Sequence, residues 1–356
     1  VHGTVAAVSD PHEIANVLGI SGVRFMVDNA AQTPFKFAFG APSCVPATSF
    51  ETAGAKLTAK DIRLLFEQKY VSYLSEMMNV PGVLTKEPEV MQKIQIAREL
   101  GFPIDGHAPG LRGEDAFHYG SVGISTDHEC LTLAEAIDKL QAGIKILIRE
   151  GSAAKNFAAL HPLIESHFAR CMFCSDDKHP DDLVTGHINV LVRRSLFLDY
   201  DLMKVLQVAC VNPVHHYNLP VGLLRLQDPA DFIVVNNLQD LAVQRTYCHG
   251  VLVAKSGQSL LPSVNIEPLN QFATLPKQVT DFNLPASGST VRVIEAVDAQ
   301  LTTAELHFPA RIKDGAIACD LDRDILKIAV VNRYRDSKPA VALVKNFGLK
   351  RGAIAS

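Results

Sequence analysis

Several carboxylate and imidazole side chains in this chain directly follow short apolar runs, and they are the residue types that bind divalent metal ions. These residues are Asp10, His12, Glu13, Glu76, His107, His128 and Asp176. Zn²⁺, Mn²⁺ and Fe²⁺ sites are built from such ligands. A single histidine at a strand end is more often hydrogen-bonded than metal-bound, but the repetition on successive runs favours one shared metal site.

The stretch "CMFCSDDKHP" (171–180) shows why a cation is expected. Its apolar run, 171–174, is typical of a buried strand, and it leads through a serine into Asp176 and Asp177. Ionised carboxylates next to a core destabilise a protein unless a positive charge compensates them. A divalent metal would supply that charge.

The elements that must position these residues alternate between apolar runs and helix-like segments. The runs cover residues 5–8, 35–39, 71–74, 103–104, 122–124, 144–148 and 171–174. Residues 88–100 repeat apolar side chains with the helical period and precede Gly101, and residues 131–142 open at a Thr132-x-x-Glu135 capping box. This alternation predicts an α/β fold with a parallel sheet.

The position of the polar residues distinguishes two kinds of parallel sheet. The strands suit either a (β/α)₈ TIM-type barrel that lacks its first strand or a doubly wound sheet. Every polar cluster follows its strand, and in a barrel those carboxyl ends converge on one mouth. No GxGxxG or GxxxxGK[ST] sequence follows a run, so a nucleotide-cofactor fold has little support. We therefore predict the barrel.

The rest of the chain reads as smaller β-rich parts. We predict the barrel over 1–218, a β subdomain over 219–262, a linker over 263–288 and the start of a C-terminal α+β domain over 289–356. The apolar runs that predict strands in the last parts are 233–235, 251–253, 291–294, 325–331 and 340–344.

Composition excludes several classes of partner. The net charge is −4, with 20% charged and 47% hydrophobic residues, which predicts a soluble globular protein without nucleic acid or membrane partners. No apolar run reaches the roughly 18 residues of a membrane span.

The seven cysteines are odd in number and scattered, which favours a reducing, cytoplasmic location. Cys171 and Cys174 would point to opposite faces of a strand, so we expect a core role for them.

The chain resembles the adenine deaminases of the amidohydrolase superfamily. The stretches that carry the resemblance are "SDPHEIANVLG" (9–19), "SCVPA" (43–47), "SEMMNVPGV" (75–83), "DGHAPGL" (105–111), "DHEC" (127–130), "IREGSAAKN" (148–156) and "CSDDKHP" (174–180). The C-terminal region also resembles that family's extra domain. The resemblance implies hydrolytic deamination of the free base adenine, the small-molecule substrate, to hypoxanthine and ammonia.

The resemblance also implies a binuclear centre of Mn²⁺ or Fe²⁺, with Zn²⁺ as a further possibility. Glu76 matches the carboxylate that bridges both metals, His107 and His128 match the next two ligands, and Asp176 matches the last one. Because neighbouring strand residues point to opposite faces, Asp176 rather than Asp177 is expected to face inward.

In the mechanism that the resemblance implies, a hydroxide held between the metals attacks C6 of adenine. Asp176 accepts its proton and passes it toward the leaving amine. Glu13 is the candidate for the acid that protonates the ring nitrogen, although an acid in the first turn of a helix is an alternative reading of this residue. The residues expected to contact substrate are Asp10, His12, Arg149, Glu150, Ser152 and Asp177.

One departure from the superfamily pattern concerns the motif His-x-His, which supplies two ligands from strand 1 and does not occur in this chain. His215 and His216 are adjacent and lie past the last barrel strand. The chain opens with Val1, where strand 2 of the pattern begins. We therefore expect an internal fragment that is inactive by itself.

Two other interpretations stay open. Another amidohydrolase that acts on a cyclic amide would use the same metals, but usually with a carboxylated lysine where this chain has Glu76. A catalytically inactive fragment with a structural or binding role is supported by the missing His-x-His. For the enzyme we expect a homo-oligomer.

The first prediction concerns the missing ligands. Adding a peptide that supplies strand 1 and its His-x-His is expected to raise the metal content of this chain from one ion at most to two, because two more imidazoles complete the ligand set. Metal analysis after gel filtration, with ammonia release from adenine, measures the effect. Two tightly bound ions and full turnover without the peptide would contradict the ligand assignment.

Overall fold

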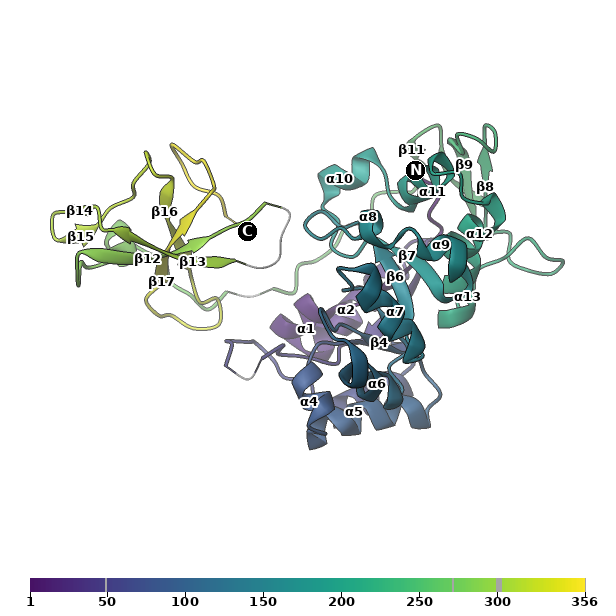
Figure 1. Cartoon of the computed structure of the whole chain (residues 1–356), viewed down its shortest axis with the longest axis horizontal. Coiled ribbons are helices and arrows are strands. Elements are labelled where there is room, and N and C mark those ends of the chain that lie inside the picture. The colour runs from purple at the N-terminus through teal and green to yellow at the C-terminus, as the bar shows by residue number, and fades with distance from the viewer. Residues whose placement is uncertain (49, 271, 299–302, 356) are drawn as a thin grey trace. The chain divides into compact units, whose positions relative to one another are not determined.

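The computed structural model describes residues 1–356 except 49, 271, 299–302 and 356, and it divides the chain into two compact units (Figure 1). The first unit is Val1–Asn270 and the second is Gln271–Ser356. This division falls inside the segment predicted as a linker, 263–288. The other predicted domain boundaries stay predictions.

The first unit is built on one sheet of seven parallel strands whose order follows the chain. The strands are β1 (Ala6–Ser9), β2 (Lys36–Ala41), β3 (Tyr73–Met77), β4 (Ile104–Gly106), β5 (Thr126–Asp127), β6 (Lys145–Arg149) and β7 (Cys171–Cys174). The sheet curls: before β1, Thr4 Oγ1 lies 2.7 Å from His187 Nδ1, and the other ring nitrogen lies 2.9 Å from Ser175 Oγ after β7. The predicted α/β fold with a barrel-type parallel sheet is confirmed.

Strand β7 of this sheet is buried on both faces. Its neighbouring residues Cys171, Met172 and Phe173 point to alternate faces, and each is at most 6% exposed. Such continuous apolar runs are typical of parallel strands covered by helices on one side and by the barrel interior on the other. The register pairs Ile146 with Cys171 and Arg149 with Cys174, so Arg149 lies at the carboxyl end of the sheet.

One predicted strand is wrong. Residues 122–124 were expected to form it, but β5 begins at Thr126. Val122 instead ends the preceding helix, and Gly123 has a φ of +109°, which a strand does not adopt.

The helices of the first unit connect the strands and cover the outside of the sheet. They are α1 (His12–Leu18), α2 (Ile20–Ala30), α3 (Ala59–Glu67), α4 (Val80–Leu84), α5 (Pro88–Glu99), α6 (Gly113–Ser121), α7 (Leu133–Gln141), α8 (Phe157–Leu160), α9 (Leu163–Ser166), α10 (Pro180–Thr185), α11 (Ile188–Phe197), α12 (Leu202–Leu206) and α13 (Asn212–Tyr217), with the 3₁₀ turn η1 (Phe168–Arg170) and the π-helical η2 (Gln207–Val211). Contacts join α2 and α3 to β2, α5 to β3 and β4, α7 to β6, and α11 to β7. No helix in the described part of the chain is both long and apolar enough to cross a membrane.

Local sequence explains where the predicted helices begin. In α5, Pro88 occupies the first turn, where its missing N–H costs nothing. At α7, the Thr132 hydroxyl accepts a hydrogen bond of 3.2 Å from the backbone N–H of Glu135. The carboxylate of Glu135, however, accepts from Leu131 rather than from Thr132, so only half of the predicted capping box forms.

A four-stranded antiparallel sheet completes the first unit. Its order is β11 (Gln258–Ser259), β10 (Val251–Lys255), β9 (Val243–Cys248) and β8 (Phe232–Val235). The predicted strands at 233–235 and 251–253 are confirmed. The buried Lys36 on β2 ties this sheet to the barrel, because its ammonium donates to Asp231 and to the carbonyl of Pro220.

The second unit contains one 3₁₀ turn, η3 (Val279–Phe282), and otherwise strands within its described residues. The strands are β12 (Thr290–Glu295), β13 (Ala304–Pro309), β14 (Ile312–Lys313), β15 (Ala316–Ile317), β16 (Ile325–Val330) and β17 (Ala340–Lys345). The strands predicted at 291–294, 325–331 and 340–344 are therefore found, but no helix occurs in the described residues of 289–356. The helices of the predicted α+β domain are thus not found among these residues, whose strands bury Val293, Ile325 and Leu343 in a small core of their own.

Candidate metal centre

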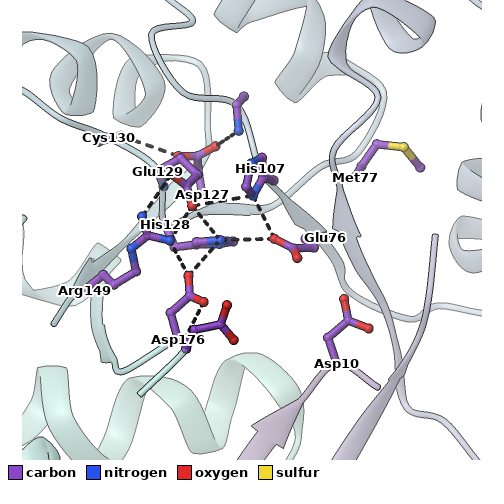
Figure 2. Close-up of polar contacts among 12 residues, drawn as sticks. Asp10, Glu76, Met77, His107, Asp127, His128, Glu129, Cys130, Arg149 and Asp176 are labelled. Carbon is purple, nitrogen blue, oxygen red and sulfur yellow. Dashed lines mark hydrogen bonds and ion pairs between the residues drawn. The ribbon is translucent and has the colours of Figure 1, made fainter. Parts of the chain in front are cut away.

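Imidazole and carboxylate groups converge at the carboxyl ends of the barrel strands (Figure 2). They form three groups of potential ligands, and within each group the ligand atoms lie within 4.8 Å of one another. The groups are Glu76–His107–His128, Asp10–His12–Glu76 and His128–Glu129–Asp176. Because neighbouring groups share Glu76 or His128, the three form one continuous site, called here the mouth cluster.

Glu76, on β3, is the carboxylate at the centre of the mouth cluster. Its Oε2 lies 2.9 Å from His107 Nδ1 and 3.1 Å from His128 Nε2, and its Oε1 lies 3.5 Å from His12 Nδ1. Burial alone would raise the pKa of Glu76, but the hydrogen bonds and charges of His107 and His128 outweigh it and hold that pKa well below the usual range. Glu76 is therefore ionised, with its two oxygens directed at different imidazoles.

His128, just after β5, faces three carboxylates from different strands. Its Nε2 lies 3.1 Å from Glu76, 3.2 Å from Glu129 and 3.4 Å from Asp176, and Figure 2 shows it between Glu76 and Asp176. Burial lowers the pKa of His128, but hydrogen bonds to Glu129 and Glu76 raise it well above the ordinary value. The electrostatic potential at the ring is therefore strongly negative, and it would attract a metal cation to the same position.

Asp10 and His12 line the opposite side of the mouth cluster, after β1. Asp10 Oδ2 lies 2.9 Å from His12 Nδ1, and burial raises the pKa of Asp10. The second oxygen, Oδ1, is buried without a hydrogen-bond partner among the described residues. For His12, burial lowers the pKa, but the bond to Asp10 and the charges of Asp10, Glu13 and Glu76 raise it to about 9.

Arg149, at the end of β6, is the one guanidinium that enters the cluster in the described structure. Its Nη1 contacts both Glu129 and Asp176, and its Nη2 lies 3.0 Å from Glu129 Oε2. Burial raises the pKa of Glu129, but His128 and Arg149 lower it to about 2. Arg149 thus holds two carboxylates of the cluster in place.

Asp176 and Asp177 differ in backbone conformation and in the contacts of their side chains. Asp176 has a φ of +49°, a left-handed conformation that is uncommon for a residue other than glycine, and its carboxylate turns toward His128 and Arg149. Asp177 is exposed, and its backbone N–H donates to Asp176 Oδ1 at 2.6 Å. The geometry agrees with the choice of Asp176 as the inward residue.

The donor set of the mouth cluster fits a divalent cation. Imidazole nitrogens and carboxylate oxygens from five strand ends come together, a buried oxygen of Asp10 has no partner among the described residues, and the carboxylates outnumber the single guanidinium. Such hard oxygen and imidazole ligands suit Mn²⁺, Fe²⁺ or Zn²⁺.

Family comparison agrees with this architecture. Residues 1–253 match the model of the amidohydrolase family. The chain belongs to the amidohydrolase family. That match contains every residue of the mouth cluster, and residues 300–356 match the adenine deaminase C-terminal domain.

Curated relatives of this amidohydrolase are named adenine deaminases. The chain is 55% identical over 356 residues to one from Salinibacter ruber and 47% identical over 362 residues to one from Borreliella burgdorferi. Each alignment covers 100% of this chain, but only 65% and 66% of the relatives, respectively. The chain therefore spans slightly less than two thirds of their length.

Solved structures share the fold at low sequence identity. A β-aspartyl dipeptidase from Fervidobacterium islandicum AW-1 aligns with a TM-score of 0.54 at 17% identity, covering 74% of this chain and 76% of its own. An N-isopropylammelide isopropylaminohydrolase from Burkholderia multivorans aligns with a TM-score of 0.50 at 14% identity, covering 72% of each chain. These likenesses support the amidohydrolase fold alone.

Besides Asp177, three residues expected in catalysis or at the substrate lie outside the mouth cluster of this amidohydrolase. Glu150 pairs with Arg194 at 3.0 Å, and Ser152 Oγ donates to Asp182 at 2.5 Å. Glu13, on the first turn of α1, exposes 66% of its side chain and lies 3.2 Å from His12. Their roles, like that of Asp177, stay predictions.

Sequence reasoning missed Glu129 as a member of the cluster. Its position directly after His128 could have indicated it. In a strand that continued through both residues, however, alternation would point these neighbours to opposite faces. The strand ends earlier, at Asp127, so His128 and Glu129 lie in a loop and both side chains reach the site.

The second prediction tests Glu76 as the shared ligand. Glu76→Gln is expected to lower the affinity for Mn²⁺ by at least about tenfold, chiefly at one position, because the amide carries no charge and offers one oxygen fewer. Titration with Mn²⁺, with free ion followed by electron paramagnetic resonance, measures the loss. Glu99→Gln, on the outer surface of α5, is the control. Full binding of metal by the Glu76 variant would exclude it as a bridge.

Proposed function

We propose that this protein is an adenine deaminase, which hydrolyses adenine to hypoxanthine and ammonia. The observation that carries the proposal is the extent of the similarity: 55% identity to a curated adenine deaminase extends over all 356 residues, and therefore over both units. The match of residues 300–356 to the adenine deaminase C-terminal domain adds support from outside the barrel.

The mouth cluster is the proposed site of this reaction. Glu76, His107, His128 and Asp176 would hold a divalent ion, and the position of Glu76 between two groups of ligands supports a pair of ions that share it. We propose Mn²⁺ or Fe²⁺, with Zn²⁺ as the alternative. The metal would supply the Lewis acidity that makes water a nucleophile near neutral pH.

Asp176 is the proposed proton carrier. Its side chain is 25% exposed, so water and substrate can reach it, and Arg149 fixes the direction of its carboxylate. In the hydrolysis, one water adds at C6 of adenine and its proton passes through Asp176 to the departing amine, which leaves as ammonia. Glu13 and the residues beside it, Asp10 and His12, are the proposed contacts of the purine ring.

The two alternatives have less support. A cyclic-amide hydrolase of the usual type would need a lysine at the end of β3, where Glu76 stands. An inactive structural fragment does not explain why carboxylates and imidazoles from five strand ends are concentrated at one point. The cytoplasmic location, the homo-oligomer and the absence of nucleic acid and membrane partners stay predictions.

The third prediction tests the reaction and its substrate. Because the curated relatives are longer than this chain, the assay uses the chain both by itself and extended with the N-terminal segment of the Salinibacter ruber relative. Adenine is expected to release ammonia faster than adenosine, cytosine or guanine in at least one of the two forms. A preference for the nucleoside, or no release in either form loaded with Mn²⁺ or Fe²⁺, would refute the proposal.

The fourth prediction separates the chemistry from folding. In the active form, Asp176→Asn is expected to lower kcat by at least about a hundredfold, because general acid–base catalysis contributes about that much and the amide cannot carry the proton. Asp181→Asn, at an exposed residue in the first turn of α10, is the control and should change kcat little. Circular dichroism of both variants checks the fold. Near-normal turnover in the Asp176 variant would remove it from the mechanism.

A further inference from the structure

A buried ion pair lies behind the two histidines of the mouth cluster. Lys139, on α7, has no exposed side-chain surface, and neither has its partner Asp127 on β5. The Lys139 ammonium donates to Asp127 Oδ1 at 3.0 Å, to Glu135 Oε1 at 2.8 Å and to the carbonyl of Ala108 at 2.6 Å. All three of its protons are therefore used.

This network accepts a hydrogen bond from the backbone N–H of the residue that follows each histidine. Asp127 Oδ2 accepts from the N–H of Ala108, directly after His107, at 2.7 Å. Asp127 Oδ1 accepts from the N–H of Glu129, directly after His128, at 2.9 Å. One carboxylate thus links the two loops that carry the histidines.

The strands alone do not fix these loops. The ladder between β4 and β5 contains two residue pairs, Asp105 with Thr126 and Gly106 with Asp127. It ends one residue before His107 and His128. Beyond that point, the two segments that carry His107 and His128 are joined through the Lys139 network. The distance between the two imidazoles therefore depends on this network.

Stability is a weak explanation for such a pair. Charged groups lose much of their hydration on burial, and apolar residues of similar volume often serve a core as well or better. Residues that hydrogen-bond to metal ligands and orient them, by contrast, change the metal affinity strongly when they are removed.

We infer that Lys139 and Asp127 are positioning residues, which hold the backbone of His107 and His128 so that both imidazoles reach one metal position. The inference rests on the metal site of the proposed function, but not on the identity of its substrate. Neither residue is catalytic, since both side chains are fully buried and cannot touch a substrate.

The chain offers a closely matched control. Lys36 and Asp231 form a second buried pair, in which the lysine also donates to a backbone carbonyl, that of Pro220. Asp231 likewise accepts from two backbone N–H groups, those of Gly222 at 3.0 Å and His249 at 2.9 Å. This pair joins the barrel to the β8–β11 sheet and has no bond to the mouth cluster in the described structure.

The test compares two double variants, Lys139→Met with Asp127→Asn and Lys36→Met with Asp231→Asn. Each removes a buried ion pair at nearly constant volume, and the first also removes the pair of Lys139 with Glu135. Titration with Mn²⁺ alone is expected to show about a 10- to 100-fold loss of affinity in the first variant and less than about a twofold change in the second. Both variants are expected to lower the thermal unfolding temperature of the metal-free chain. A loss of Mn²⁺ affinity in the first variant alone would then reflect positioning of the ligands and not the stability of the fold.

Amide hydrogen exchange supplies a readout that does not depend on metal. Exchange at Ala108 and Glu129 should accelerate in the first variant, and exchange at Gly222 and His249 in the second. If a double variant does not fold, Asp127→Asn and Asp231→Asn alone provide the same comparison.

Unchanged Mn²⁺ affinity in the Lys139 variant, or an equal loss in both variants, would overturn the inference. If the unsubstituted chain takes up no Mn²⁺, the inference falls together with the metal site. If it binds Mn²⁺ but deaminates nothing, only the proposed function fails.

Discussion

The concentration of negative charge at the carboxyl ends of the strands is the constraint on which the rest of this structure depends. The carboxylates of Asp10, Glu76, Glu129 and Asp176 each lie within a few ångströms of at least one of the three imidazoles of the mouth cluster. Carboxylates so close together repel one another, and burial adds to the cost. The arrangement is stable only with positive charge between them, which the imidazoles and Arg149 supply in part and which a divalent cation would complete.

A second layer of charge supports the first. Lys139, Asp127 and Glu135 lie behind the histidine loops, where water does not reach them. Tyr119 adds a neutral link, because its hydroxyl donates to the carbonyl of Met77 at 2.6 Å and accepts from the N–H of His107 at 3.0 Å. Loops that carry ligands are thereby fixed by side chains from the outer helices. The ladder alone is too short to fix them, since β4 and β5 have three and two residues.

The barrel explains why residues far apart in the chain meet. Parallel strands place all their carboxyl ends on the same side, so each βα connection adds a side chain to the same mouth. The fold is shared with hydrolases of different substrates at identities of 14–17%. The fold alone therefore does not select a substrate, which is set by the loops and side chains at the mouth of the barrel.

The sequence by itself determined the parallel α/β architecture, because apolar runs and helical periods are local properties of neighbouring residues. It also indicated Glu76, His107, His128 and Asp176, since each belongs to a polar cluster that follows such a run. The pairing of Glu129 with Arg149, the inward turn of Asp176 through a positive φ and the Lys139 network were decided only by the tertiary structure. Each of these features depends on the residue at which a strand ends and on which side chain, distant in the sequence, lies next to that end. Adjacent residues such as His128 and Glu129 can share a site only because the strand stops before them, and no pattern of alternation carries that information.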